Sequence, residues 1–155
     1  MLKYVSFDIV FQEVPDEVTL AINLSLCPNF CVGCHSPHLT GDIGEELTTE
    51  ALDALIECYA ASVSCVCFMG GDNDPRSVEM MAQHIHQKWR LKTAWYSGRD
   101  EFPSNPQVLD YVKLGGYRSE LGGLKCPTTN QQMYKLVGQG EYEDITYKLQ
   151  CKNSI

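Results

Sequence analysis

The chain has 155 residues, of which 44% are hydrophobic, and its formal net charge is −8 at pH 7. This length is that of one domain with a substantial core, so we expect a single domain spanning residues 1–155. The chain has twelve basic residues, which form no basic run, and twenty acidic ones. Nucleic-acid binding requires clustered positive charge, so a nucleic-acid partner is not expected.

The apolar segments and the cysteines indicate the cellular compartment. No segment approaches the roughly eighteen uninterrupted apolar residues that span a bilayer, and residues 1–8 lack the long apolar stretch of a signal peptide. Three of the eight cysteines lie within residues 27–34. Metal or cluster ligation in a reducing compartment explains this crowding better than a disulfide scaffold does. We therefore expect a soluble, cytoplasmic protein without a membrane partner.

The amino-terminal half of the chain predicts alternating strands and helices. Residues 1–13 alternate apolar side chains only loosely and are a candidate for an extra strand. Residues 18–26 are rich in β-branched and apolar side chains, which predicts a strand that ends directly at Cys27. Residues 50–59 carry apolar side chains at helical spacing behind a threonine cap, which predicts a helix. Residues 62–69 form a short β-prone run bounded by two glycines.

The carboxy-terminal half continues this alternation. A helix is predicted after Pro75, where apolar residues recur at 3.6-residue spacing. Alternation of this kind implies parallel βα units, but an eight-fold barrel takes about 250 residues. The expected fold is therefore α/β, a partial, open (βα) barrel with a mostly parallel sheet. The remaining expected elements are strands at 91–96, at 111–114 and within 133–137, a short helix at 106–109, and loops at 100–106 and 115–130.

The cysteine motif is the strongest chemical signal in the sequence. It has the form Cys27-Pro-Asn-Phe-Cys31-Val-Gly-Cys34-His35, and it lies at the carboxyl end of a predicted strand, where active sites of parallel sheets collect. Three thiolates at this spacing suit three irons of an iron–sulfur cube and leave the fourth iron open. The spacing alone also allows a zinc site of three cysteines completed by His35 or His38.

The other cysteines and histidines carry no comparable pattern. We expect the five remaining cysteines to be buried as small hydrophobic side chains. These are Cys58, Cys65, Cys67, Cys126 and Cys151. His38, His84 and His86 are expected at the surface or in satisfied polar contacts.

The exact Cys-x3-Cys-x2-Cys spacing after the first strand of a βα domain resembles the signature of radical S-adenosylmethionine enzymes. The resemblance implies the partial barrel of that family. It also implies that Cys27, Cys31 and Cys34 hold a [4Fe-4S] cluster, and that the amino and carboxylate groups of S-adenosylmethionine chelate the fourth iron.

Two further segments match this family. Gly70-Gly71-Asp72 follows the second strand, where the family has a Gly-Gly-Glu segment that meets the methionyl amino group. The aspartate is one methylene shorter than the family's glutamate. Ser97 ends the next strand, where the family contacts the nucleoside and methionine parts of the cofactor, so the resemblance implies that Ser97 is a cofactor-binding residue.

A narrower resemblance comes from the residues around the third cysteine. The family more often places an aromatic residue where Gly33 stands, so adenine contacts are expected from backbone groups and from His35. The Gly33-Cys34-His35 sequence and the stretches at 111–116, 120–124 and 128–132 resemble the activating proteins of anaerobic ribonucleotide reductase.

That resemblance implies a reaction and two partners. An external electron donor reduces the cluster, S-adenosylmethionine is cleaved, and the resulting 5′-deoxyadenosyl radical takes a hydrogen from a glycine of the large reductase subunit. No protein side chain is needed as acid or base, and the cofactor carries the chemistry. The loop at 116–129 is the expected docking segment for the reductase subunit.

Other functions fit parts of the same pattern. An activator of a different glycyl-radical enzyme and a small radical enzyme of modified-base synthesis are the nearest alternatives, since both share the cofactor chemistry. A non-catalytic zinc or iron–sulfur module that binds a partner is the alternative from another class. Metal analysis distinguishes this last alternative from the enzymes.

Overall fold

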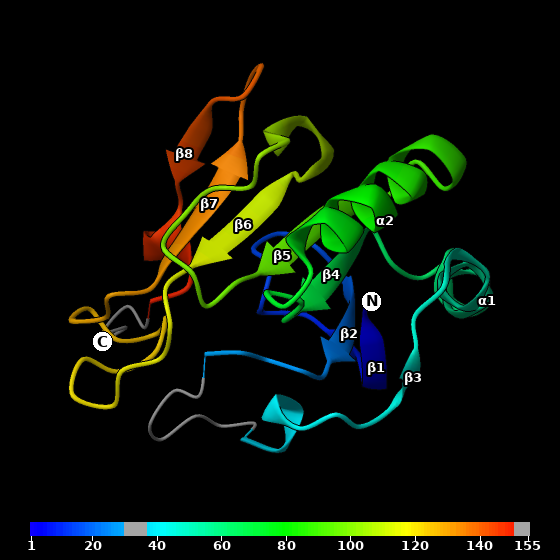
Figure 1. The fold of residues 1–155 in the computed structure, drawn as a ribbon. Coiled ribbons are helices and arrows are strands. Elements are labelled where there is room, and N and C mark those ends of the chain that lie inside the picture. Colours follow the sequence, from blue (N-terminus) through cyan, green and yellow to red (C-terminus); the bar gives the residue numbers. More distant parts are fainter. Residues whose placement is uncertain (30–36, 151–155) are drawn as a thin grey trace.

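The protein is described by a computed structural model that covers residues 1–29 and 37–150. These residues form one sheet of eight strands and two α-helices, and Figure 1 shows their arrangement. The elements are β1 (Lys3–Val10), β2 (Thr19–Leu24), η1 (Pro37–Thr40), β3 (Glu45–Glu46), α1 (Thr49–Tyr59), β4 (Cys65–Met69), α2 (Pro75–Lys88), β5 (Lys92–Tyr96), η2 (Pro106–Val108), β6 (Tyr111–Leu114), β7 (Gln132–Leu136), β8 (Tyr142–Asp144) and η3 (Thr146–Lys148).

The sheet is mixed, and this corrects the expected fold. Its strand order is β3-β1-β2-β4-β5-β6-β7-β8. The three central pairings, β2 with β4, β4 with β5 and β5 with β6, are parallel. The four outer pairings are antiparallel. The prediction of a partial, open (βα) barrel with a mostly parallel sheet is therefore wrong.

The lengths of the connections agree with the parallel centre and with two of the antiparallel pairings, whereas the longer connection of β6 to β7, residues 115–131, also joins antiparallel neighbours. Parallel neighbours need a crossover of about a dozen residues or more, which is usually helical. In the described residues, α1 and α2 supply two such crossovers, and the segment that contains η2 supplies the third. Residues 11–18 between β1 and β2, and residues 137–141 between β7 and β8, are too short for a crossover and return the chain as antiparallel neighbours.

The two α-helices form where the sequence predicts them. The Thr48 side chain caps α1 by accepting a hydrogen bond from the Ala51 amide at 3.1 Å. The Asp74 carboxylate caps α2 through the Ser77 amide at 3.3 Å, and Pro75 occupies the first turn. Both helices bury an apolar stripe against the sheet. No helix among the described residues is long and apolar enough to cross a membrane.

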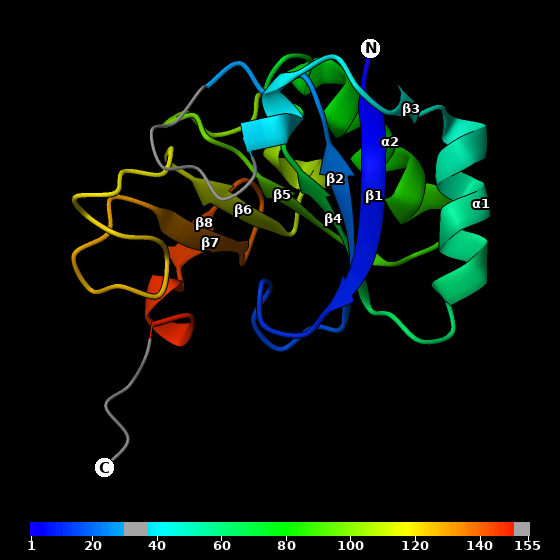
Figure 2. The ribbon, with the colours of Figure 1, turned by 90° about the horizontal axis from the view of Figure 1, so that it is seen from below.

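The sheet has an apolar core on each face. Side chains alternate along a strand, so Val66 and Phe68 of β4 join the core shared with both helices, while Cys65 and Cys67 join the core on the opposite face. Figure 2 shows α1 and α2 on one side and the loop between β6 and β7 (yellow) on the other side of the view. The second face is thus covered by loops and chain ends.

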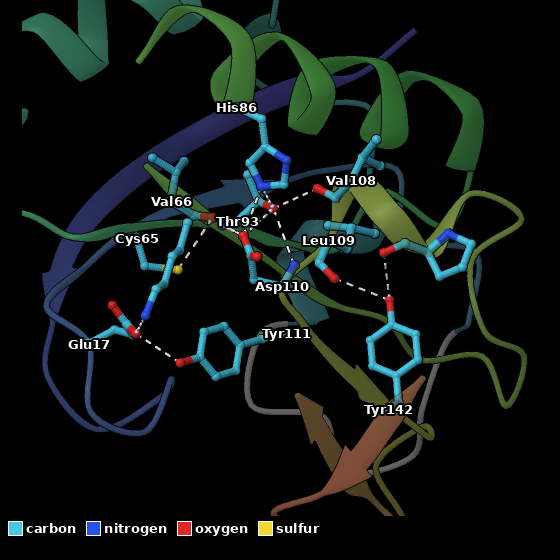
Figure 3. Close-up of polar contacts among 12 residues, drawn as sticks. Glu17, Cys65, Val66, His86, Thr93, Val108, Leu109, Asp110, Tyr111 and Tyr142 are labelled. Atoms are coloured by element: carbon cyan, nitrogen blue, oxygen red, sulfur yellow. Dashed lines mark hydrogen bonds and ion pairs between the residues drawn. The ribbon is translucent and has the colours of Figure 1, made fainter. Parts of the chain in front are cut away.

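Polar contacts fix the edge of the sheet where the parallel strands begin. The Glu17 carboxylate is buried and accepts hydrogen bonds from Lys92 Nζ at 2.9 Å and from the Tyr111 hydroxyl at 2.8 Å. These bonds outweigh the cost of burial and lower the pKa of Glu17. Beside it, Asp110 accepts from the Thr93 amide and lies 2.8 Å from His86 Nε2 (Figure 3). Every group named here has a protein partner, which favours a structural role for this edge.

Candidate functional site

The predicted site residues that are described gather at the opposite edge, where the parallel strands end. Cys27 follows β2, Gly70 follows β4 and Ser97 follows β5. Because these strands are parallel neighbours, the three segments meet at one edge of the sheet. In Figure 1 the arrowheads of β4 and β6 point toward this edge, where the segment after β2 (light blue) and the loop between β6 and β7 (yellow) also lie.

The segment around Cys27 is held by its backbone. The amide of Cys27 donates to the carbonyl of Leu39 at 2.9 Å, and the amide of Leu26 donates to Gly41 at 3.1 Å. Leu26 has a φ of 61°, in the left-handed region that a leucine rarely adopts. This turn directs the chain out of β2, and the Cys27 side chain is partly exposed and free of any disulfide.

The other predicted residues of the cysteine motif lie outside the described residues. These are Cys31, Gly33, Cys34 and His35. Among the described residues, no three histidine, cysteine, aspartate or glutamate side chains gather as a metal site.

Asp72 is the centre of the hydrogen-bond network at this edge. Its side chain is buried, and one oxygen accepts from the Ser97 hydroxyl at 2.6 Å. The other oxygen accepts from the Gly98 amide at 2.8 Å and from Asn29 Nδ2 at 2.7 Å. The structure therefore brings together the predicted residues Asp72 and Ser97, and it joins them to the cysteine segment through Asn29.

Asn29 and Gly98 are site residues that sequence reasoning missed. Asn29 Nδ2 also lies 3.5 Å from Cys27 Sγ, within the range of a hydrogen bond to sulfur. Gly98 makes room for it, because a Cβ there would lie 2.5 Å from Asn29 Nδ2. An asparagine two residues after a cysteine was the available signal in the sequence, but its partner Asp72 is 43 residues away.

The glycine pair is required by its backbone conformation. Gly70 and Gly71 have φ values of 107° and 93°, which favour glycine. A Cβ on Gly71 would lie 2.6 Å from Val78 Cγ2 of α2. The Gly70 carbonyl accepts a hydrogen bond from Trp95 Nε1 at 2.7 Å, so its orientation is fixed. The pair turns the chain so that Asp72 points toward β5.

A cavity of about 600 Å³ connects these groups with the loop-covered face of the sheet. Cys27, Gly70 and Asp72 line one part of it, and side chains of β4, β5 and β6 line another. Residues of the loop between β6 and β7 also line the cavity. A cavity of this size accommodates a drug-sized ligand.

Charges of both signs line the cavity. Glu13 and Asp72 supply carboxylates, while Lys113 and Lys125 supply ammonium groups. Lys113 is buried, donates to the Gly115 carbonyl at 2.9 Å and lies 5.5 Å from the centre of the Tyr96 ring. This mixture of charges suits a ligand that carries a cation and a carboxylate.

The remaining cysteines divide into two groups. Cys65 and Cys67 are buried as predicted, and burial raises the pKa of both thiols. The prediction is wrong for Cys58 and Cys126, which are exposed. Cys58 lies two residues after the buried Ile56, which places it on the outer side of α1.

Cys126 lies at the cavity, whereas the described histidines lie at the surface or beside carboxylates. Cys126 is in a loop and lines the cavity, whereas Cys151 is outside the described residues. His84 and His86 lie 2.9 and 2.8 Å from carboxylate oxygens of Asp53 and Asp110, and His38 is exposed. The expected surface or satisfied polar roles of these histidines are confirmed.

Comparison with known proteins adds no relative. No family model, curated protein or solved structure matches the chain.

Proposed function

We propose that this chain is a radical S-adenosylmethionine enzyme that generates a glycyl radical on the large subunit of an anaerobic ribonucleotide reductase. Cys27, Cys31 and Cys34 would hold the [4Fe-4S] cluster, and an external donor would reduce it. One observation carries the proposal. Cys27 and Asp72 come from segments far apart in the chain, yet they line the same cavity at the edge where parallel strands end.

The described residues fit the two groups that this activity needs. Cys27 offers a partly exposed thiol beside a cavity, and thiolates are the usual ligands of iron–sulfur clusters. The cavity volume of about 600 Å³ suits a ligand of the size of S-adenosylmethionine. When bound, the reduced cluster supplies the electron that breaks a carbon–sulfur bond of S-adenosylmethionine.

The residues of this chain would bind and orient the ligand. The Asp72 carboxylate lines the cavity and would attract the methionyl amino group. Its oxygens already accept three hydrogen bonds, which fix the direction in which the negative charge faces. Lys113 brings positive charge to another part of the wall, where it would attract the carboxylate. No described group is needed as an acid or base.

The position of the loop between β6 and β7 is an argument for a protein substrate. Gly116, Tyr117, Leu124 and Lys125 of this loop line the cavity. A glycine-bearing segment of the reductase must reach the same space in which S-adenosylmethionine is cleaved. A loop that forms part of the cavity wall is a suitable place for the two proteins to meet.

Anaerobic reconstitution tests this proposal. The wild-type chain is loaded with iron and sulfide, reduced, and supplied with S-adenosylmethionine and the large reductase subunit. We expect 5′-deoxyadenosine and a glycyl-radical signal. Cys27→Ser should abolish both products, while Cys58→Ser should retain them, because Cys58 is exposed on α1 and does not line the cavity.

The same experiment identifies the alternatives. Tight binding of zinc with no product, or a cluster that is indifferent to S-adenosylmethionine, would show a non-catalytic module. Formation of 5′-deoxyadenosine without a radical on the reductase would show a radical enzyme with another substrate.

A further inference from the structure

We propose that Asn29 is a positioning residue that sets how readily the cluster on Cys27 accepts an electron. Its side-chain amide contacts Cys27 Sγ and the Asp72 carboxylate at the same time. The inference rests on the proposed function, because it concerns the cluster that Cys27 would bind. It goes further by naming a residue outside the cysteine motif that acts on the sulfur.

The geometry requires the amide nitrogen of Asn29 to face both partners. An asparagine NH₂ group carries two hydrogens and can donate to two acceptors. Here Nδ2 is 2.7 Å from Asp72 Oδ2 and 3.5 Å from Cys27 Sγ. The amide oxygen in this place would face the Asp72 oxygen at 2.7 Å, and that carboxylate already accepts from the Ser97 hydroxyl and the Gly98 amide. The contacts therefore fix the orientation of the side chain.

Asp72 gives Asn29 a rigid support. The carboxylate is only 6% exposed, and it is held by the Ser97 hydroxyl at 2.6 Å and by the Gly98 amide at 2.8 Å. Ser97 is itself fixed, because it directly follows β5 and its amide donates to the Lys113 carbonyl of β6 at 2.8 Å. Asn29 is thus held by the turns that directly follow β4 and β5.

This arrangement has an electronic consequence. A hydrogen bond to a thiolate withdraws negative charge from the sulfur, and hydrogen bonds to cluster sulfurs are among the factors that set reduction potentials. Less charge on Cys27 makes the cluster easier to reduce. Loss of the Asn29 amide should therefore lower the reduction potential and leave a smaller fraction of the cluster reduced at any fixed donor strength.

The test is an anaerobic redox titration of the reconstituted chain, followed by the paramagnetic signal of the reduced cluster. At the potential where half of the wild-type cluster is reduced, the ratio of reduced to oxidised cluster in Asn29→Ala should be lower by about three- to tenfold, as expected for the loss of one hydrogen bond of ordinary net strength. Iron and sulfide content is measured in every sample.

The matched control is Asn23→Ala. Asn23 lines the same cavity, but its amide donates to Ser6 at 2.9 Å and to Asp8 at 3.4 Å. Its loss should leave the ratio within about twofold of wild type, since no hydrogen bond to Cys27 is removed. An equal decrease in both variants would attribute the effect to general disturbance of the cavity and overturn the proposal.

A second variant covers the case in which Asn29→Ala fails to fold or to hold a cluster. Gly98→Ala keeps the asparagine but places a Cβ 2.5 Å from its Nδ2, which must then move away. We expect the same direction of change in the ratio. A wild-type ratio in a fully loaded Asn29→Ala or Gly98→Ala chain would overturn the role of Asn29 and leave the proposed function intact. Absence of a cluster from the wild-type chain would overturn both.

Discussion

At the scale of single residues, the site depends on a few residues whose backbone and side-chain conformations are fixed by their contacts. Asp72 is buried and accepts three hydrogen bonds, so any shift of its backbone moves Asn29, Ser97 and Gly98 together. The residue that controls this backbone is Gly71, which immediately precedes Asp72 and has a positive φ.

Gly71→Ala should destabilise the fold by about 2 to 4 kcal/mol, because it combines an unfavourable φ with overpacking. The new Cβ would lie 2.6 Å from Val78 Cγ2 and 3.0 Å from Leu24 Cδ1. Urea denaturation followed by circular dichroism measures the change. Gly138→Ala is the control, since the nearest atom to its Cβ is a flexible glutamate oxygen at 3.6 Å, and a change within about 0.5 kcal/mol is expected. Equal stability of the two variants would contradict the prediction.

At the scale of elements, a polar cluster joins the two helices. Asp53 of α1 accepts hydrogen bonds from Lys88 Nζ and Trp89 Nε1, each at 2.8 Å, and lies 2.9 Å from His84 Nε2. Burial raises the pKa of Asp53, but these contacts outweigh burial and lower it to about 2 from an ordinary value of 3.8. The carboxylate therefore stabilises the packing of α1 against α2 while it is ionised.

This lowered pKa predicts a pH-dependent contribution to stability. Since the folded-state pKa lies below the unfolded value, the contribution is fully present above about pH 4 and is lost as the pH falls through about 2. Asp53→Asn should reduce the free energy of unfolding by about 1 kcal/mol at pH 7, as expected for charged hydrogen bonds near the surface. The difference from wild type should vanish in acid. Asp100→Asn, at an exposed position, is the control and should leave the free energy of unfolding at pH 7 within about 0.5 kcal/mol of wild type.

The elements also show what the sequence could predict. The helices were predictable because Thr48 and Asp74 mark their starts and a buried stripe defines each inner face. The four parallel strands were also found, with small differences at their ends. The strand β8 was missed because it has three residues and little apolar character. The prediction of a mostly parallel sheet was wrong because the outer pairings are antiparallel, and the sequence pattern did not distinguish these strands from further βα units.

The candidate site was also predictable only in part. The positions of Cys27, Gly70 and Asp72 at strand ends were predictable from local patterns. Their partners were not, because the contact between Asn29 and Asp72 depends on two strands lying side by side. Ser97 was predicted to bind a cofactor, and the structure shows that its hydroxyl donates to Asp72, a contact that the sequence did not indicate.

At the scale of the whole molecule, the two faces of the sheet have different coverings. The helices close one face with a continuous core, while the other is covered by residues 11–18, by the loop between β6 and β7 and by residues 145–149. The cavity lies on this second face, where loops can be exchanged without removing a helix.

Replacement of residues 116–129 by a short glycine–serine linker should affect cleavage of S-adenosylmethionine and radical formation on the reductase to different extents. Leu114 pairs with Gln132, so a short turn can join β6 to β7 without breaking the sheet. We expect the glycyl radical on the reductase to be lost, and 5′-deoxyadenosine formation to decrease less, because Cys27, Asp72 and Lys113 are retained although part of the cavity wall is removed. Radical formation at the wild-type level would count against docking by this loop. Shortening residues 137–141, which join β7 to β8, is the control and should leave both products unchanged.

The hydrogen bond from the Trp95 indole to the Gly70 carbonyl has a practical consequence. Trp95 is almost fully buried, and its partner carbonyl belongs to a residue that lines the cavity. Indole emission responds to the polarity and hydrogen bonding of its surroundings. The chain has one other tryptophan, Trp89, which follows α2 and contacts Asp53. Trp95 is therefore a built-in fluorophore one hydrogen bond away from the cavity wall, and Trp89→Phe would isolate its emission for titrations with small molecules.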